Sequence, residues 1–176
     1  MDGRQKLKLN DEKTETITFR SKNNLQRLPA NSVTVGDNLI QASKPVRNLG
    51  FHLDETLSMD DHISKTKQKC FLNVRNIRKI RQYLDEETTK ILVQAFVTSH
   101  LDYCNAMLYG MTKHQMKQLQ RIQNSCARLI AQTNIRDHIT PVLIDLHWLP
   151  LEHRATFKIA TMVYKAIHGL AYIPRT

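Results

Sequence analysis

The fold is decided by the stretch Ile63-Ser64-Lys65-Thr66-Lys67-Gln68-Lys69-Cys70-Phe71-Leu72-Asn73-Val74-Arg75-Asn76-Ile77-Arg78-Lys79-Ile80-Arg81, residues 63–81. Its apolar residues Cys70, Val74 and Ile77 recur every three or four positions, which predicts a helix with one buried face. Basic residues fill the opposite face, and the stretch contains no acid. An exposed helix more often alternates the sign of its charges, although a run of one sign can also be a solvated surface.

This helix is the predicted site of the molecule. A one-sided row of cations is the pattern expected of a surface that contacts phosphates. We predict that nucleic acid binds through the basic residues Lys65, Lys69, Arg75, Arg78 and Lys79.

The charge of the whole chain is concentrated around and after this stretch. The formal net charge is +10 and the isoelectric point about 9.7. Residues 1–62 carry nine Lys and Arg and nine Asp and Glu, whereas residues 63–176 carry seventeen against seven. Such a balance favours a polyanionic partner, first nucleic acid and second an anionic membrane surface.

Helical periodicity continues downstream of residue 81. Helices are predicted from Asp85 to about Leu108, from Thr112 through the apolar stripe that ends at Ile130, over 141–146, and over 151–168 with Gly169 as the stop. Ser58 or Asp60 is the expected N-cap of the basic helix. The predicted bundle is therefore mostly α-helical.

The first third of the chain predicts strands instead. Residues 33–35 and 38–40 flank Gly36-Asp37, which indicates a tight hairpin. Residues 16–19 are β-branched and alternating, and residues 46–53 alternate as one half-buried strand. The predicted class is α+β, with short antiparallel strands over residues 1–57 followed by the helical region 58–176.

Composition excludes several classes of protein. No run approaches the ~18–20 apolar residues of a membrane span, and no secretory signal is visible. The three cysteines Cys70, Cys104 and Cys126 are widely spaced, which argues against a disulfide framework. We expect a cytoplasmic or nuclear protein that needs no cofactor of its own.

Three groups of residues could carry chemistry, but each has a simpler structural interpretation. Asp60-Asp61 could hold metal ions, but it lacks the hairpin context of a polymerase pair, so helix capping is favoured. His100 and Cys104 stand four apart on the predicted helix, but a zinc site needs more ligands and a buried cysteine is the simpler interpretation. Trp148 could stack on a base, but packing between helices is favoured. No metal site is therefore predicted.

Ten segments in order resemble the reverse transcriptases of non-LTR (LINE-type) retrotransposons, and together they cover essentially the whole chain. The first two are the segment 7–15 (LKLNDEKTE), similar to the family pattern L-x-L-N-x-x-K-T-E, and the segment 46–54 (VRNLGFHLD), similar to V-x-x-L-G-v-x-x-D. The others are His62-Ile63, Arg75-Asn76-Ile77, 95–99 (AFVTS), 101–105 (LDYCN), 119–124 (LQRIQN) with 127–130 (ARLI), 138–143 (HITPVL), 146–150 (LHWLP) and 164–170 (YKAIHGL).

The resemblance implies the C-terminal part of the polymerase. The first segment would be motif D of the palm, with Lys13 as the lysine that assists nucleotide addition, and the second would be motif E. The helices would form the thumb, which holds the primer–template duplex by its phosphates, and the region after it.

The family's catalytic aspartates lie upstream of motif D, and the sequence lacks them. Because these carboxylates hold the Mg²⁺ ions of the full enzyme, we expect a catalytically incomplete fragment of an RNA-directed DNA polymerase. It would bind RNA, DNA or an RNA–DNA hybrid, and its remaining partners would be the missing palm and fingers or a second copy. The alternatives are a protein-interaction module without enzymatic activity and a remnant of the retroelement without function.

Overall fold

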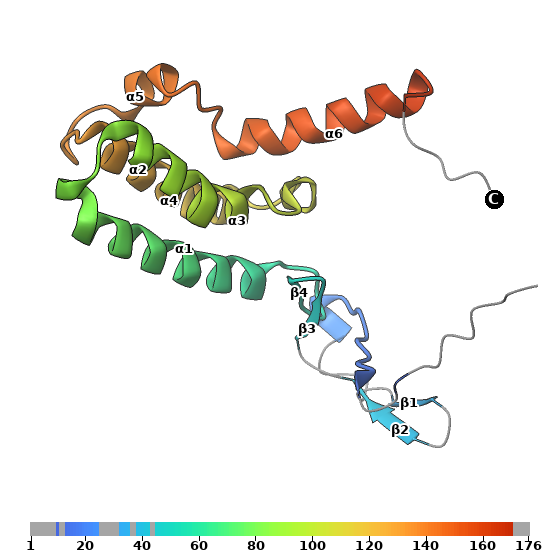
Figure 1. Cartoon of the computed structure of the whole chain (residues 1–176). Helices are drawn as coiled ribbons and strands as arrows, with labels where there is room; N and C mark the ends of the chain where they lie inside the picture. The colour runs from blue at the N-terminus through green and yellow to red at the C-terminus, as the bar shows by residue number, and fades with distance from the viewer. Residues whose placement is uncertain (1–9, 11–12, 25–31, 36–37, 43–44, 171–176) are drawn as a thin grey trace, which may run out of the picture. The chain divides into compact units, whose positions relative to one another are not determined.

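The computed structural model describes residues 10, 13–24, 32–35, 38–42 and 45–170. The chain forms two compact units, Met1–His62 and Ile63–Thr176. Short antiparallel strands lie in the first unit and the helices make up the second, which confirms the α+β class (Figure 1).

The first unit contains two small hairpins. Strand β1 (Ser32–Val35) pairs antiparallel with β2 (Asn38–Gln41), and Val35 is the register partner of Asn38. The hairpin predicted around residues 36–37 is therefore confirmed in its flanking strands. Strand β3 (Val46–Asn48) pairs in the same way with β4 (Phe51–Leu53).

The second hairpin corrects one prediction, because residues 46–53 do not form a single strand. The chain reverses at Leu49 and Gly50, which have φ values of 47° and 88°. Positive φ at both central positions is the geometry of a two-residue hairpin turn. The reversal leaves the Leu49 side chain 87% exposed, whereas Phe51 is buried.

The strand predicted over 16–19 is also wrong. Thr16 forms only an isolated bridge to Ala42, and the Phe19 side chain is half exposed. A short 3₁₀ turn, η2 (Lys22–Asn24), follows.

Asp54 organises the loop that leads into the first helix, α1 (Asp60–Ile80). Its carboxylate accepts hydrogen bonds from the backbone N–H groups of Thr56, Ser58 and Met59, at 3.0, 2.8 and 2.7 Å. Burial raises the pKa of Asp54, but the hydrogen bonds from Ser58 and Thr56 outweigh it and hold the pKa below its usual value. Ser58 Oγ also accepts from the Asp60 N–H at 3.3 Å. Because α1 begins at Asp60, the N-cap position falls to Met59, and neither Ser58 nor Asp60 is the N-cap that the sequence predicts.

The second unit is built from helices that follow one another with short connections. After α1 come η3 (Arg81–Tyr83), α2 (Glu86–Val93), the π-helical segment η4 (Gln94–Thr98), α3 (Ser99–Asp102), η5 (Asn105–Leu108), α4 (Lys113–Ala131), α5 (Ile139–Asp145) and α6 (Leu151–Ile167). None of the helices in the described part of the chain is long and apolar enough to cross a membrane.

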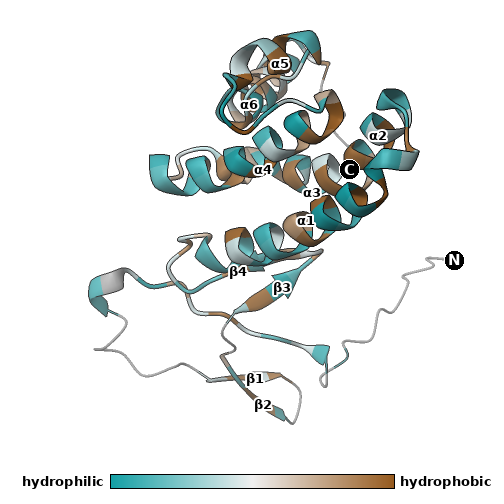
Figure 2. Ribbon diagram, turned by 90° about the vertical axis from the view of Figure 1, so that its left-hand side faces the viewer, coloured by the Kyte–Doolittle hydropathy of each residue, from teal (hydrophilic) through white to brown (hydrophobic). Residues whose placement is uncertain are grey.

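The core of this unit lies where α1, α2, η4 and α4 meet. Its most deeply buried side chains include Cys70, Val93, Val97, Leu119, Ile122, Cys126 and Ile130. Figure 2 shows the corresponding brown stripes on the inner sides of these helices, with teal on the outer sides. The predicted apolar stripes of the first and third helices of this unit thus face the core, and the second predicted helix adds Val93 and Val97.

The second predicted helix is shorter than expected. The α-helix ends at Asp102, since Tyr103 is extended and Cys104 is left-handed with a φ of 52°, and only the 3₁₀ turn η5 follows. His100 and Cys104 therefore do not lie one turn apart on a helix. The part of the chain that the structure describes contains no cluster of His, Cys, Asp or Glu able to hold a metal ion.

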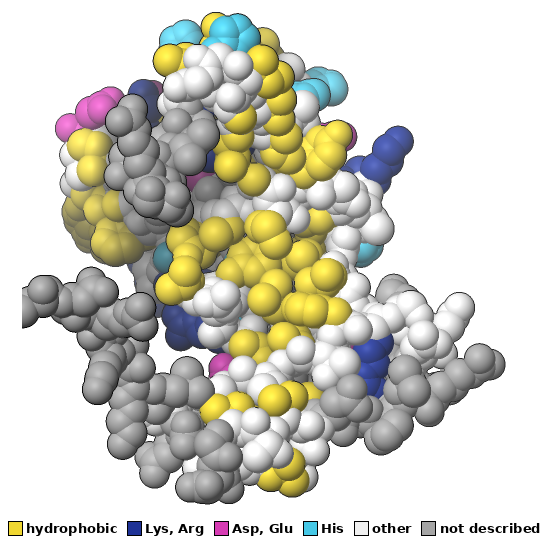
Figure 3. All heavy atoms as spheres, turned by 90° about the vertical axis from the view of Figure 1, so that its right-hand side faces the viewer, with side chains coloured by type: hydrophobic (Ala, Val, Ile, Leu, Met, Phe, Trp, Pro, Cys, Tyr) yellow, Lys and Arg dark blue, Asp and Glu magenta, His cyan; other side chains and the backbone are white. Residues whose placement is uncertain are grey.

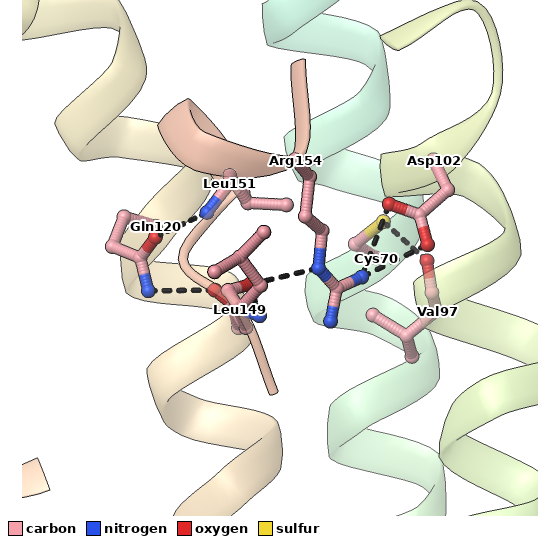
Figure 4. Close-up of polar contacts among 8 residues, drawn as sticks. Cys70, Val97, Asp102, Gln120, Leu149, Leu151 and Arg154 are labelled. Carbon is pink, nitrogen blue, oxygen red and sulfur yellow. Dashed lines mark hydrogen bonds and ion pairs between the residues drawn. The ribbon is translucent and has the colours of Figure 1, made fainter. Parts of the chain in front are cut away.

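The first turn of α6 is tied to the bundle by polar contacts (Figure 4). Arg154 Nη1 donates to both carboxylate oxygens of Asp102, and Arg154 Nε donates to the Leu149 carbonyl at 2.8 Å. Gln120 on α4 accepts from the Leu151 N–H at 3.0 Å, and Gln123 donates to the Leu149 carbonyl at the same distance. These contacts fix where α6 begins.

Candidate nucleic-acid interface

The outer face of α1 carries four of the five predicted site residues. Lys65, Lys69, Arg75 and Lys79 are all exposed. The inner face of the same helix buries Cys70, Val74 and Ile77, each at most 4% exposed. The amphipathic division that the sequence predicts is therefore present, and these four residues are called the α1 row below.

Few interactions within the chain neutralise this row. Among the described residues, Lys69, Arg75 and Lys79 are not paired with a carboxylate. Lys69 lies close enough to α3 to affect His100, whose pKa is lowered by burial and further by the Lys69 charge. The row can therefore meet an anion without first breaking an ion pair of its own at these three positions.

Arg78 lies apart from the row. It is exposed, but it lies on the flank of α1 that faces α4, where its charge acts on Cys126. Burial and, to a lesser extent, the neighbouring Cys70 raise the pKa of Cys126 to about 12, and the Arg78 charge opposes this rise. Arg78 thus lies between the α1 row and α4.

Two other cations of the stretch have structural partners. Lys67 Nζ donates to Gln118 Oε1 on α4. Arg81 donates from Nε to the Leu129 carbonyl and from Nη2 to the Ile130 carbonyl, both at 2.9 Å. A cation at the last carbonyls of a helix is favourable because those oxygens have no partner within the helix. Arg81 therefore stabilises the end of α4.

These contacts also give the direction of α4. Lys67 meets Gln118, and Arg81, fourteen residues later, meets Leu129 and Ile130. Because the residue numbers of the contacting partners rise together along the two helices, α1 and α4 run parallel.

A second basic row on α4 was missed by the sequence reasoning. Lys113, Lys117 and Arg121 are spaced by four residues, and all three are exposed. The signal was present in the sequence, because residues 103–136 contain no acid. Lys113, Lys117 and Arg121 are called the α4 row below.

The start of α4 is held by a reciprocal cap. Thr112 Oγ1 accepts from the Gln115 N–H at 3.3 Å, and Gln115 Oε1 accepts from the Thr112 N–H at 3.1 Å. Arg128, in the last turns of the same helix, donates to the carbonyls of Asn134 and Asp137. Arg128 is therefore engaged with the following loop and is not part of the α4 row.

No family model, curated protein or solved structure matches this chain.

Lys13 lies in the first unit, and most of the segment 7–15 that contains it falls outside the described residues. The Lys13 side chain is exposed, and its N–H donates to the Asn10 carbonyl at 3.1 Å. The sequence that resembles motif E forms the β3–β4 hairpin and its turn.

Asp60 and Asp61 lie in the first turn of α1, where the helix dipole favours negative charge.

Trp148 lies in the connection between α5 and α6. It is half-buried, and its backbone N–H donates to the Leu143 carbonyl at 2.7 Å. This backbone contact ties Trp148 to the end of α5.

Proposed function

We propose that the helical unit binds the phosphate backbone of nucleic acid without sequence preference. The observation that carries this proposal is the α1 row, which presents Lys65, Lys69, Arg75 and Lys79 on one exposed face opposite a buried one. From Lys65 to Lys79 the helix rises about 21 Å, at ~1.5 Å per residue. Such a row can contact several phosphates along one strand.

The ordered resemblance of ten segments supports a more specific origin. We propose that the chain corresponds to the C-terminal palm and thumb of a non-LTR retrotransposon reverse transcriptase. The nucleic acid would then be a primer–template duplex, as DNA or as an RNA–DNA hybrid, in the cytoplasm or the nucleus. Because the sequence lacks the family's catalytic aspartates, the chain alone should not extend a primer, with or without Mg²⁺.

Fluorescence anisotropy tests the binding. A labelled DNA duplex and an RNA–DNA hybrid of unrelated sequence should bind with similar affinity. If the α1 row neutralises four phosphates, the logarithm of the affinity should fall against the logarithm of salt with a slope of about −3 to −4. Absence of binding at low salt would overturn the proposal.

A pair of matched variants separates the row from general charge. The triple variant Lys69→Glu, Arg75→Glu and Lys79→Glu should lose at least about tenfold in affinity and flatten the salt slope. The control Arg136→Glu, Lys158→Glu and Lys165→Glu changes the net charge equally at other exposed positions. Equal losses in the two variants would show that only the overall charge matters.

A protein-interaction module is the second candidate. It is favoured by α6, on which large apolar side chains such as Phe157 and Ile167 are exposed. Light scattering after size exclusion distinguishes the candidates, since a stable oligomer that ignores nucleic acid supports the second.

A further inference from the structure

A continuous groove runs between η5, α4 and α6. One cavity of about 620 Å³ is lined by the end of η5, by α4 and by the start of α6, and includes Met116 and Leu143. Another of about 420 Å³ follows α6 past Ile159 and Val163. Both cavities are lined by Tyr109 and Thr156, so they form one groove, called the α4–α6 groove below.

Among the described residues, little packs on the later turns of α6, the helix that forms one wall of this groove. Within α6 only Leu151 and Ala155, in its first turns, are buried. Beyond them Phe157, Val163 and Ile167 are 68%, 51% and 74% exposed. Figure 3 looks onto the end of the helical unit where α6 and η5 finish, and it shows hydrophobic side chains spread over that face. A helix that is apolar on several sides is normally covered by another structure.

The charges around the α4–α6 groove indicate what kind of structure covers it. Lys113 and Lys117 line the first cavity, and Glu152 is its one acidic lining residue. The unit as a whole carries seventeen Lys and Arg against seven Asp and Glu. A second copy would bring two surfaces of the same sign together, which is unfavourable. Nucleic acid would contact lysines only at the end of the groove that Lys113 and Lys117 line, because the cavity along the rest of α6 has no Lys or Arg in its lining.

We propose that the α4–α6 groove binds an amphipathic helix of a partner protein, with apolar residues in the groove and acidic residues facing Lys113 and Lys117. This is the helix-in-groove mode of recognition, in which residues spaced by three and four positions act as anchors. The groove follows α6 from Glu152 to Ile167, which is about 22 Å at the helical rise, so a partner helix of about fifteen residues fills it.

A designed peptide tests the proposal with the full chain. The probe is a fluorescein-labelled amphipathic helix of about sixteen residues, with Leu at the anchor positions and Glu on the flanks. The control probe carries Lys at every Glu position. Anisotropy should show saturable binding of the acidic peptide, with an affinity at least about tenfold higher than that of the basic peptide.

Neighbouring residues of α6 supply the matched variants. Val163 lines the groove, whereas Met162 does not and is exposed to a similar extent, at 55%. Val163→Glu should weaken binding of the acidic peptide at least about tenfold, while Met162→Glu, which adds the same charge, should stay within about twofold. Lys117→Glu should weaken binding of the acidic peptide and strengthen binding of the basic peptide.

Three outcomes would overturn the proposal. The first is no saturable binding of the acidic peptide up to about 1 mM. The second is an equal response of the Val163→Glu and Met162→Glu variants. The third is a dimer in sedimentation that Val163→Glu converts to a monomer, because the groove would then be filled by a second copy. Duplex binding by the Val163→Glu variant should remain unchanged, which keeps this test separate from that of the nucleic-acid interface.

Discussion

Arg154 on α6 donates from Nη1 to both carboxylate oxygens of Asp102 on α3, at 2.9 and 3.1 Å, across 52 positions of the chain. The Arg154 side chain is 16% exposed and that of Asp102 38% exposed, so solvent screens the pair only in part. The pair holds the first turn of α6 at the point where its apolar side chains change from buried to exposed. It therefore sets the position of one wall of the α4–α6 groove.

A double-mutant cycle measures this contact. Arg154→Ala, Asp102→Ala and the double variant should give a coupling free energy of about 0.5–1 kcal/mol, because the carboxylate is partly exposed. Arg154→Ala alone should cost more than Asp102→Ala, since it also removes the bond to the Leu149 carbonyl. Urea denaturation followed by Trp148 fluorescence reports the values. A coupling near zero would mean that the pair contributes nothing to stability.

Arg81 should matter for stability and not for binding. Arg81→Ala leaves the Leu129 and Ile130 carbonyls without their charged donor, and should lower the free energy of unfolding by about 1–3 kcal/mol. Lys79→Ala, two residues earlier on the outer face, should change it by less than about 0.5 kcal/mol. A similar small effect of both substitutions would contradict the capping role of Arg81.

The helical part of the fold could be predicted from local patterns. The spacing of Cys70, Val74 and Ile77 places the buried face of α1 correctly, and Thr112 begins α4 as expected. The hairpin at 46–53 could not be found in this way, because Leu49 continues the alternation of Phe51 and Leu53 although it occupies the turn. A period-2 pattern does not distinguish one long strand from two short ones that share a turn.

The site was predicted only in part, for a related reason. A helical wheel identifies the outward Lys65, Lys69, Arg75 and Lys79 without tertiary information. It cannot show that Arg81 lies against the end of α4, because that contact joins positions 48 and 49 residues apart. The α4 row could have been found from the spacing of Lys113, Lys117 and Arg121 alone.

The first unit should lose stability as the pH falls below about 6.5, the ordinary pKa of histidine. His62 is buried and stacks on Phe51 with ring centroids 4.0 Å apart. Burial lowers the pKa of His62, and the nearby His52 lowers it further. The unfolded chain therefore binds a proton in a range where the folded unit does not, so acid favours unfolding in that range.

Urea titrations that follow the His62 ring by NMR should show this loss between about pH 7.5 and about pH 5.5. The variant His62→Phe keeps an aromatic ring on Phe51 and should reduce the pH dependence of the free energy of unfolding. For this variant, unfolding is followed by the NMR signals of the Phe51 ring. His114→Phe, at an exposed position on α4, should leave it unchanged. A His62 that titrates at or above 6.5 in the folded chain would contradict the prediction.

The three thiols should differ sharply in reactivity. Burial raises the pKa of Cys70 to about 11 and that of Cys126 to about 12, and both side chains are buried, whereas Cys104 is exposed. Since the thiolate is the reactive form, N-ethylmaleimide at about pH 8 should modify Cys104 alone in the folded chain. Mass spectrometry should find one adduct without denaturant and three in urea. Rapid modification of Cys126 in the folded chain would show that the core opens.

The α4 row should add phosphate contacts that are separate from those of the α1 row, because Lys113 and Lys117 line the α4–α6 groove whereas the α1 row lies on the outer face of α1. If each cation of the α4 row meets one phosphate, removing two of them should reduce the steepness of the salt slope by about 1.8, at ~0.9 per phosphate. The variant Lys117→Gln with Arg121→Gln tests this without adding negative charge. Its control, Lys158→Gln with Lys165→Gln, removes the same charge from exposed positions of α6 and should leave the slope within about 0.5 of the original. Equal slopes for both variants and the unchanged chain would restrict the interface to the α1 row.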